Sequence, residues 1–214
     1  HAGPLDNIVF MGMGEPMMNL PSVRKAISVL CDKRGRNLSG RRITLSTSGV
    51  IKGLYDLADN GPLIRLAVSL TTADPELRQE LMPIGRTNPL PELRKAIDYY
   101  AKKTGKRVTL EAALLHHTNT SDQSAQNMID FASGIQCHIN LIPWNPVDSL
   151  PFSRPSNNES RRFFEKLEKA GLNVTLRTPR GQEIGGACGQ LGKTLSDKIG
   201  DGKKLSGSKN FGNE

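Results

Sequence analysis

The sequence predicts an α/β fold built around a parallel sheet, and three observations support this prediction. Short apolar runs rich in Ile, Val and Leu alternate with amphipathic helical segments along the chain. Most of these runs are apolar at successive positions, as in strands that are buried on both faces. The length of 214 residues suits a single domain. A barrel or partial barrel and an open, doubly wound sheet both satisfy this alternation.

Six runs are predicted as strands, because each is short, apolar and rich in β-branched residues. They span residues 8–11, 43–45, 64–70, 108–115, 138–142 and 174–176.

Three helices are predicted from apolar residues that recur at the helical period. The first begins after Asn19 with Pro21 in its first turn, where the missing N–H costs nothing. The second begins at Ser121, and the third begins with the capping box Ser156–Asn157–Asn158–Glu159. The expected inward positions are Val23, Ala26, Ile27, Leu30 and Cys31, then Ala125, Met128, Ile129 and Ala132, then Phe163, Leu167 and Ala170.

The composition excludes several classes of protein. With 36% apolar residues and 21 glycines, the chain is not disordered over most of its length. No run approaches the roughly 18 apolar residues of a membrane span, and no signal peptide is visible. The 29 Lys and Arg residues exceed the 21 Asp and Glu residues and give a net charge of +8. This excess favours a polyanionic partner such as nucleic acid.

The three cysteines are far apart and odd in number, which excludes a disulfide framework and a self-contained zinc site and indicates a reducing compartment. Cys31 belongs to a helical stripe and Cys137 precedes a strand, so both are expected to be inert packing. Cys188 differs, because it lies in the glycine-rich segment 185–191 after the last strand. A thiol there is accessible enough to react.

Basic residues near Cys188, namely Arg177 and Arg180, can favour its thiolate. The same region nearly matches a phosphate-binding loop through Gly192–Lys193–Thr194. The spacing from Gly186 is one residue too long, and no strand-to-helix passage frames it, so this interpretation is discarded.

Ligands gather at the carboxyl ends of parallel strands, so the residues after each strand are candidate site residues. After the first strand, Gly14 and Glu15 present a glycine-lined end and one carboxylate, which can receive an ammonium group. Met17 stands where a dinucleotide fingerprint needs its third glycine, so that fingerprint fails. A tight turn before a helix is the alternative for this segment.

Later strand ends are rich in polar groups. Residues 46–49 and 69–72 offer hydroxyls that can bind a ligand or cap a helix. Residues 142–146 form a rigid turn with one indole and one amide. Glu111 lies inside an apolar run, where burial is costly unless it is paired. The pair at 116–117 has no Cys, Asp or Glu at ligand spacing, so ordinary loop histidines and no metal ligands are expected.

Taken together, five segments resemble one family, the radical S-adenosylmethionine (SAM) enzymes that methylate adenine at C2 in ribosomal and transfer RNA. They occur in the family's order and cover residues 7–191. They are Phe10–Pro16, Ile43–Gly49, Leu66–Leu70, Leu141–Pro146 and Ala187–Leu191.

The resemblance implies a site and a mechanism. Gly14 and Glu15 would meet the methionyl amino group of SAM, and Cys188 would be the methyl-carrying catalytic cysteine. The other implied SAM contacts are Ser46, Ser69, the backbone at Leu70, Thr71 and Asn145. In the family, the thiolate accepts a methyl group from one SAM, and a second SAM is cleaved reductively to generate a radical on that methyl carbon. This carbon then attacks adenine C2.

The sequence also departs from the family. The cysteine run C-x3-C-x2-C that holds the family's 4Fe-4S cluster is absent, as are the first barrel strand and the N-terminal RNA-binding domain. Thr71 replaces a usual histidine, and Gly185–Gly186 replaces an acidic-and-small pair. These departures predict a C-terminal fragment, with an incomplete barrel over residues 1–191 and a disordered tail over 192–214.

The resulting hypothesis is a radical SAM RNA (adenine-C2)-methyltransferase whose present chain is inactive alone. A non-catalytic RNA- or SAM-binding module derived from such an enzyme is the alternative, and an unrelated barrel enzyme for phosphorylated substrates is a third. The expected partners are ribosomal RNA, with transfer RNA as a further substrate, and an electron donor to the cluster. A monomer in the cytoplasm, or in an organelle, without membrane contact is expected.

Overall fold

Six strands form one parallel sheet in the computed structural model, which describes residues 6–146 and 150–177. The strands are β1 (Ile8–Phe10), β2 (Ile43–Thr47), β3 (Arg65–Ser69), β4 (Val108–Leu114), β5 (Cys137–Pro143) and β6 (Val174–Leu176). Their order in the sheet follows their order in the chain. A doubly wound sheet would reverse its order at a switch point, so that alternative is excluded. The predicted α/β fold with an incomplete barrel is confirmed.

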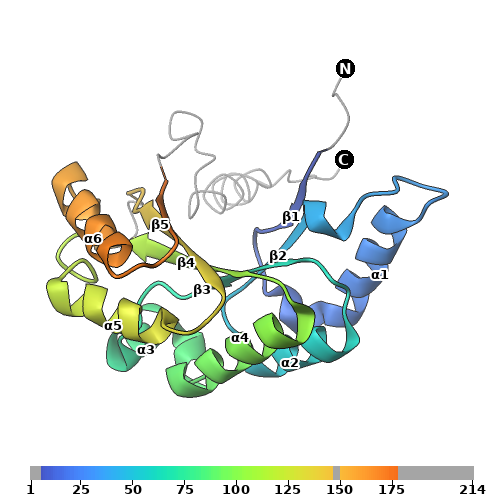
Figure 1. Ribbon diagram of the computed structural model, residues 1–214, viewed down its shortest axis with the longest axis horizontal. Coiled ribbons are helices and arrows are strands. Elements are labelled where there is room, and N and C mark those ends of the chain that lie inside the picture. The colour runs from blue at the N-terminus through green and yellow to red at the C-terminus, as the bar shows by residue number, and fades with distance from the viewer. Residues whose placement is uncertain (1–5, 147–149, 178–214) are drawn as a thin grey trace, which may run out of the picture.

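Helices connect the strands and lie along the outer side of the curved sheet (Figure 1). They are α1 (Leu20–Cys31), α2 (Ile51–Asn60), α3 (Pro75–Leu81), α4 (Leu90–Thr104), α5 (Asp122–Ala132) and α6 (Asn157–Lys169). Three short 3-10 helices accompany them: η1 (Pro16–Asn19), η2 (Gly40–Arg42) and η3 (Pro83–Arg86). Among the described residues, no helix covers the inner side of the sheet (Figure 1). None of the described helices is long and apolar enough to cross a membrane.

The prediction of two buried faces is wrong for β2 and β4, whereas in β3 the successive residues Leu66, Ala67 and Val68 are all buried. In β4, every second residue from Val108 to Leu114 is fully buried, and the residues between them are half-buried. Strand β2 alternates in the same way. One face packs against the helices, whereas the other faces a hollow instead of a second helical layer. These strands therefore pack against the helices with one face and line the hollow with the other.

The predicted helix signals are confirmed where they are local. Pro21 lies in the first turn of α1, and the Ser121 side chain accepts a hydrogen bond from the Ser124 N–H at the start of α5. The capping box of α6 is complete, because Ser156 and Glu159 each accept from the other's backbone N–H. Two residues expected to point inward do not. Ala26 and Ala170 are exposed, and Ala170 follows the last residue of α6 as its C-cap.

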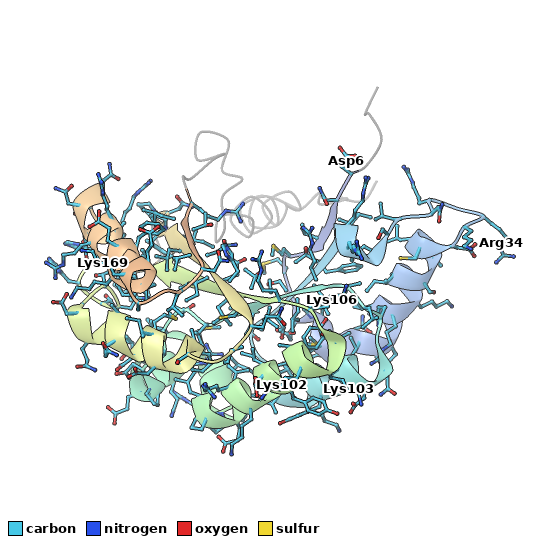
Figure 2. All side chains as sticks on the ribbon, in the orientation of Figure 1. Asp6, Arg34, Lys102, Lys103, Lys106 and Lys169 are labelled. Carbon is cyan, nitrogen blue, oxygen red and sulfur yellow. The ribbon has the colours of Figure 1, made fainter. Side chains whose placement is uncertain are left out.

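Charged side chains extend from the outer surface of the helices (Figure 2). On α4, Lys102 and Lys103 are paired with Asp98 and Asp59 at 2.7 Å and 3.6 Å. Exposed pairs of this kind add little stability, so the free energy of folding comes from the apolar layer between sheet and helices.

We expect Gly53→Ala to lower the free energy of unfolding by about 1–2 kcal/mol, because the usual overpacking cost of about 1–3 kcal/mol is only partly offset by helix propensity. A Cβ at Gly53 on α2 would lie 2.7 Å from the Met17 Cβ in η1, and neither backbone can easily retreat. This cost exceeds the gain of about 1 kcal/mol in helix propensity. Urea unfolding measures it, with Gly12→Ala as the control, because a Cβ at Gly12 meets nothing within 4 Å. Equal or greater stability of Gly53→Ala would contradict the packing described here.

Candidate functional site

A hollow of about 700 Å³ opens at the carboxyl ends of the strands. Its volume lies within the range of small-molecule sites, roughly 300–1,000 Å³. Six of the seven predicted SAM contacts line it, although they come from separate segments of the chain. They are Gly14, Glu15, Ser46, Ser69, Thr71 and Asn145.

Leu70, the seventh predicted contact, lies behind the residues that line the hollow. Its side chain is fully buried in the core. Its backbone is also occupied, since the N–H donates to the Glu111 carbonyl at 2.9 Å and the carbonyl accepts from Arg78 at 2.6 Å. Leu70 therefore supports the wall of the hollow and does not form it.

Glu15 joins the ends of β1 and β2. Its Oε1 accepts from the Thr47 hydroxyl at 2.8 Å and from the Met17 N–H at 3.0 Å. Its Oε2 accepts from the Ser48 N–H at 2.7 Å and from the Ser48 hydroxyl at 2.6 Å. These four donors hold the carboxylate at the rim of the hollow. The sequence predicted a ligand role for Glu15 but not this structural one.

Arg78 of α3 is buried beneath the same rim, with 1% of its surface exposed. Its guanidinium donates to the Ser48 carbonyl at 2.8 Å, the Leu70 carbonyl at 2.6 Å and the Ser69 carbonyl at 3.2 Å. Burial lowers the pKa of Arg78 to about 10, so the group remains protonated near neutral pH. Sequence reasoning missed Arg78, because no local pattern marks a buried arginine that binds carbonyls.

Thr71 adopts a backbone conformation that β-branched residues rarely tolerate, with φ of 60°. Its N–H donates to the Glu111 carbonyl at 3.1 Å, and its carbonyl accepts from the Asn119 side chain at 2.9 Å. The Asn119 side chain also donates to the Ala113 carbonyl at 2.7 Å. Hydrogen bonds to its N–H and its carbonyl thus hold the Thr71 backbone in this strained conformation beside the hollow. Backbone strain of this kind is often found at functional sites.

Among the further residues that line the hollow, three carry a charge or an indole N–H: Glu111, Arg177 and Trp144. Glu111 accepts from the Asn140 side chain at 3.0 Å, and burial raises its pKa although this hydrogen bond, Arg177 and His138 oppose the rise. Arg177 places a cation at the same wall. The indole Nε1 of Trp144 is buried and has no hydrogen-bond partner within the described part of the chain. An unpartnered donor beside a hollow suits a ligand acceptor. The sequence marked Glu111 by its burial cost and Trp144 by its place after a strand.

The hollow fits SAM by the chemistry of its wall. A carboxylate at Glu15 suits an ammonium group, and Gly14 reaches a φ of 98° that only glycine adopts readily. The wall also offers hydrogen-bonding groups, namely the hydroxyls of Ser46 and Ser69 and the indole N–H of Trp144. These groups suit the hydroxyl, carboxylate and ring nitrogen groups of SAM.

An iron–sulfur cluster does not fit the described residues. Cys31 ends α1 and Cys137 begins β5, on separate elements, and burial raises the pKa of the Cys137 thiol. The one group of three or more metal-ligating side chains in residues 6–146 and 150–177 contains no cysteine. Cys188, Arg180, Gly185–Gly186 and the predicted tail 192–214 lie outside the described residues.

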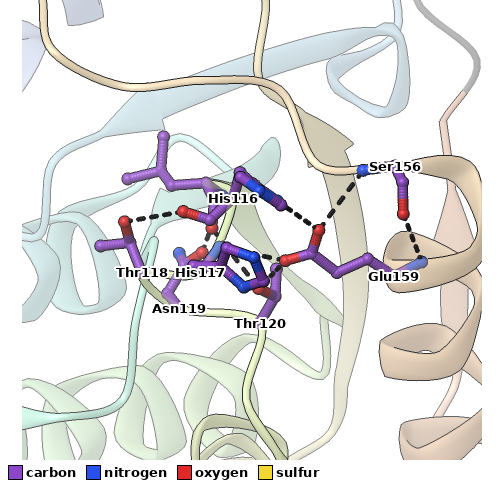
Figure 3. Close-up of polar contacts among 8 residues, drawn as sticks. His116, His117, Thr118, Asn119, Thr120, Ser156 and Glu159 are labelled. Carbon is purple, nitrogen blue, oxygen red and sulfur yellow. Dashed lines mark hydrogen bonds and ion pairs between the residues drawn. The ribbon is translucent and has the colours of Figure 1, made fainter.

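The sequence places no acidic residue at ligand spacing from His116 and His117, but the fold brings one to them. Glu159 at the start of α6 lies beside both, with its Oε2 at 2.7 Å from the His116 Nδ1 (Figure 3). Its Oε1 accepts from the His117 N–H at 3.1 Å and from the Thr120 hydroxyl. Burial raises the pKa of Glu159, but these hydrogen bonds outweigh it and lower the pKa to about 2. A spacing rule cannot find a partner that lies 43 residues away in sequence.

Comparison with known proteins gives consistent matches. The model of the Radical SAM superfamily matches residues 1–132. A protein named "Probable dual-specificity RNA methyltransferase RlmN" from Treponema denticola is 63% identical over 195 residues, which cover 91% of this chain and 56% of that protein. The protein of the same name from Treponema pallidum (strain Nichols) is 55% identical over 192 residues, with 90% and 56% covered. The chain thus spans about half the length of the curated relatives it matches.

Solved structures agree on the fold. The crystal structure of a radical SAM methyltransferase from Sphaerobacter thermophilus superposes with a TM-score of 0.85 at 41% identity, covering 87% of this chain and 55% of that one. Streptococcus suis SuiB bound to S-adenosylmethionine has a TM-score of 0.57 at 17% identity, covering 80% and 42%, which supports the fold alone.

We expect Glu111→Gln to stabilise the protein at neutral pH. Burial raises the pKa of Glu111, so the folded state holds its proton more tightly than the unfolded state. This group therefore costs stability increasingly as pH rises above the ordinary carboxyl range, and the cost is absent below that range. Glutamine keeps the acceptor for Asn140 and carries no charge.

Urea unfolding from pH 4 to pH 8 tests this expectation. The stability gain of Glu111→Gln should grow with pH, whereas the exposed Glu80→Gln should show no such growth. A gain that is independent of pH would refute the role given to burial.

Proposed function

The chain belongs to the radical SAM superfamily, and from this membership we propose that it supplies the SAM-binding part of an RNA methyltransferase acting on adenine C2. One observation carries the proposal. Six residues that the resemblance associates with SAM, spread from Gly14 to Asn145, gather around one hollow at the carboxyl ends of the strands. Relatives named as RNA methyltransferases support the reaction class.

In this proposal, each wall residue recognises a part of SAM by its chemistry. The methionyl ammonium meets the Glu15 carboxylate and the Gly14 backbone, and it takes the place of one of the four donors that hold Glu15 in this structure. Ser46, Ser69 and Asn145 bind the ribose hydroxyls and the carboxylate, and Arg177 adds a cation at the same wall. Thr71 occupies the position where the family usually has histidine, so its hydroxyl replaces an imidazole contact. SAM supplies an electrophilic methyl group when it is bound.

Cys188 is proposed as the nucleophile of the first methyl transfer. Its thiolate attacks the methyl carbon of SAM, so that an S–C bond forms, the sulfonium C–S bond breaks and S-adenosylhomocysteine leaves. This carbon becomes the methyl group at adenine C2 only after a hydrogen atom is removed from it, so that a radical on the carbon adds to C2. Reductive cleavage of a second SAM needs a 4Fe-4S cluster and an electron donor. No step of it is assigned to the described residues, since they hold no three-cysteine set. The chain alone is therefore proposed to be inactive.

The proposed macromolecular substrate is ribosomal RNA, with transfer RNA as a further one. The net charge of +8 favours the phosphate backbone of RNA. Free thiols at Cys31 and Cys137 suit a reducing compartment such as the cytoplasm.

We expect the chain to bind SAM, and Ser46→Ala/Ser69→Ala to weaken that binding about tenfold. Each lost hydrogen bond is worth roughly 0.5–1.5 kcal/mol, and about 1.4 kcal/mol corresponds to a factor of ten. Isothermal titration calorimetry with SAM measures the affinity. Ser28→Ala is the matched control, because Ser28 bonds only within α1. Absence of SAM binding, or equal binding by the double variant, would contradict the site.

We expect Cys188→Ala to abolish methylation in a form of the protein that includes the cluster-binding region of its family, while SAM affinity stays within about twofold. Without the thiolate, no covalent methyl carrier forms. Mass spectrometry of digested RNA measures 2-methyladenosine, and Cys31→Ala serves as the cysteine control. Methylation by Cys188→Ala at the normal level would remove Cys188 from the mechanism. Binding of SAM and RNA by that longer form without methylation would favour the non-catalytic module.

A further inference from the structure

We propose that His116, His117 and Glu159 form a binding site for a divalent transition-metal ion of the zinc class. The site lies outside the SAM hollow and does not depend on the proposed function. Figure 3 shows the two imidazole rings turned toward the Glu159 carboxylate. Each of the three residues offers a donor atom, and these atoms all lie within 4.8 Å of one another.

Two separate elements of the fold bring these donors together. The histidines follow β4, and Glu159 lies in the first turn of α6. The backbone ties the two elements as well, because the His116 N–H donates to the Ser153 carbonyl at 3.0 Å. The donors are therefore positioned before any ion arrives, which lowers the cost of binding.

The distances suit a small ion after a modest adjustment. Bonds of about 2.0–2.2 Å in a tetrahedral site place donor atoms roughly 3.4 Å apart. The His116 Nδ1 and the Glu159 Oε2 are now 2.7 Å apart in a hydrogen bond. An ion that takes the place of the proton in this hydrogen bond needs these atoms to separate by less than about 1 Å, and that proton moves to the other ring nitrogen or to solvent.

Neighbouring groups hold the carboxylate in place. Thr120 and the backbone N–H groups of His117 and Ser156 all donate to Glu159. Partners of this kind orient the ligands of metal sites. His117 itself has φ of 52°, and its ring lies 3.7 Å from the His116 ring, centroid to centroid. Within the described part of the chain, no hydrogen bond engages the His117 ring, so its nitrogens are available.

The donor set selects the class of ion. Two imidazoles and one carboxylate suit zinc, nickel or copper, whereas magnesium and calcium prefer oxygen alone. The residues border a surface hollow of about 500 Å³, which leaves a fourth position for water. The other charged groups there are paired, since Asp122 contacts Arg162 at 2.9 Å and Lys166 at 2.6 Å.

Zinc titration of the chain tests the proposal. The four histidines are His1, His116, His117 and His138, so His1→Ala/His138→Ala retains only the proposed pair. We expect this variant to bind Zn²⁺ like the parent chain in calorimetry, and His116→Ala/His117→Ala to bind at least tenfold more weakly. Both variants keep all three cysteines, so thiol binding contributes equally.

Two single variants guard against loss of the fold. His117→Ala removes a ring without hydrogen bonds, and Glu159→Gln keeps a side chain that can complete the capping box of α6. Each is expected to keep the native circular dichroism spectrum and to weaken Zn²⁺ binding at least tenfold. Parent-like affinity in the folded His117→Ala variant, or absence of Zn²⁺ binding by the parent chain, would overturn the site.

Discussion

The hollow depends on a pair of opposite charges that share Ser48. Beyond the ends of β2 and β3, backbone groups leave the hydrogen-bond ladder of the sheet and need other partners. Glu15 accepts from the Ser48 N–H and hydroxyl, and Arg78 donates to the Ser48 carbonyl. The Glu15 carboxylate thus accepts hydrogen bonds from the donors of this rim, and the Arg78 guanidinium donates to its carbonyl groups. Because these partners lie at and under the rim, they do not fill the hollow.

This arrangement explains why the inner face of the sheet tolerates polar residues. A half-buried row on β2 and β4 carries Ser46 and Glu111 toward the hollow, whereas the other row packs under the helices. Asn119 extends the support to the next strands by bonding the Thr71 and Ala113 carbonyls. The rim is therefore linked from β1 to β4 by side chains whose hydrogen bonds to backbone groups of neighbouring strands hold these strand ends in place.

The sequence alone predicted the features whose signals lie within a few neighbouring residues. All six strands, the capping box of α6 and Pro21 in α1 follow from signals within a few residues. The rule that ligands gather at the carboxyl ends of parallel strands singled out the segments that contain the six hollow residues, and the resemblance to a family gave each residue a role. Arg78 and Glu159 were not found in their roles, because their partners lie 30 and 43 residues away. Burial on both faces was predicted wrongly for β2 and β4, since an apolar run does not reveal which face lines a ligand site.

Departures from ordinary local rules cluster around the two proposed sites. Thr71 at positive φ, the unpartnered indole N–H of Trp144 and the raised pKa of Glu111 all occur around the hollow. A second group occurs where α6 meets the loop after β4, with His117 at positive φ and the buried Ser160 hydroxyl unpartnered within the described residues. Asn37, the remaining positive-φ residue outside glycine in the described chain, is of a type that tolerates this conformation and lies in an exposed loop. Costs concentrated in this way support the two proposed sites by an argument that does not use the resemblance.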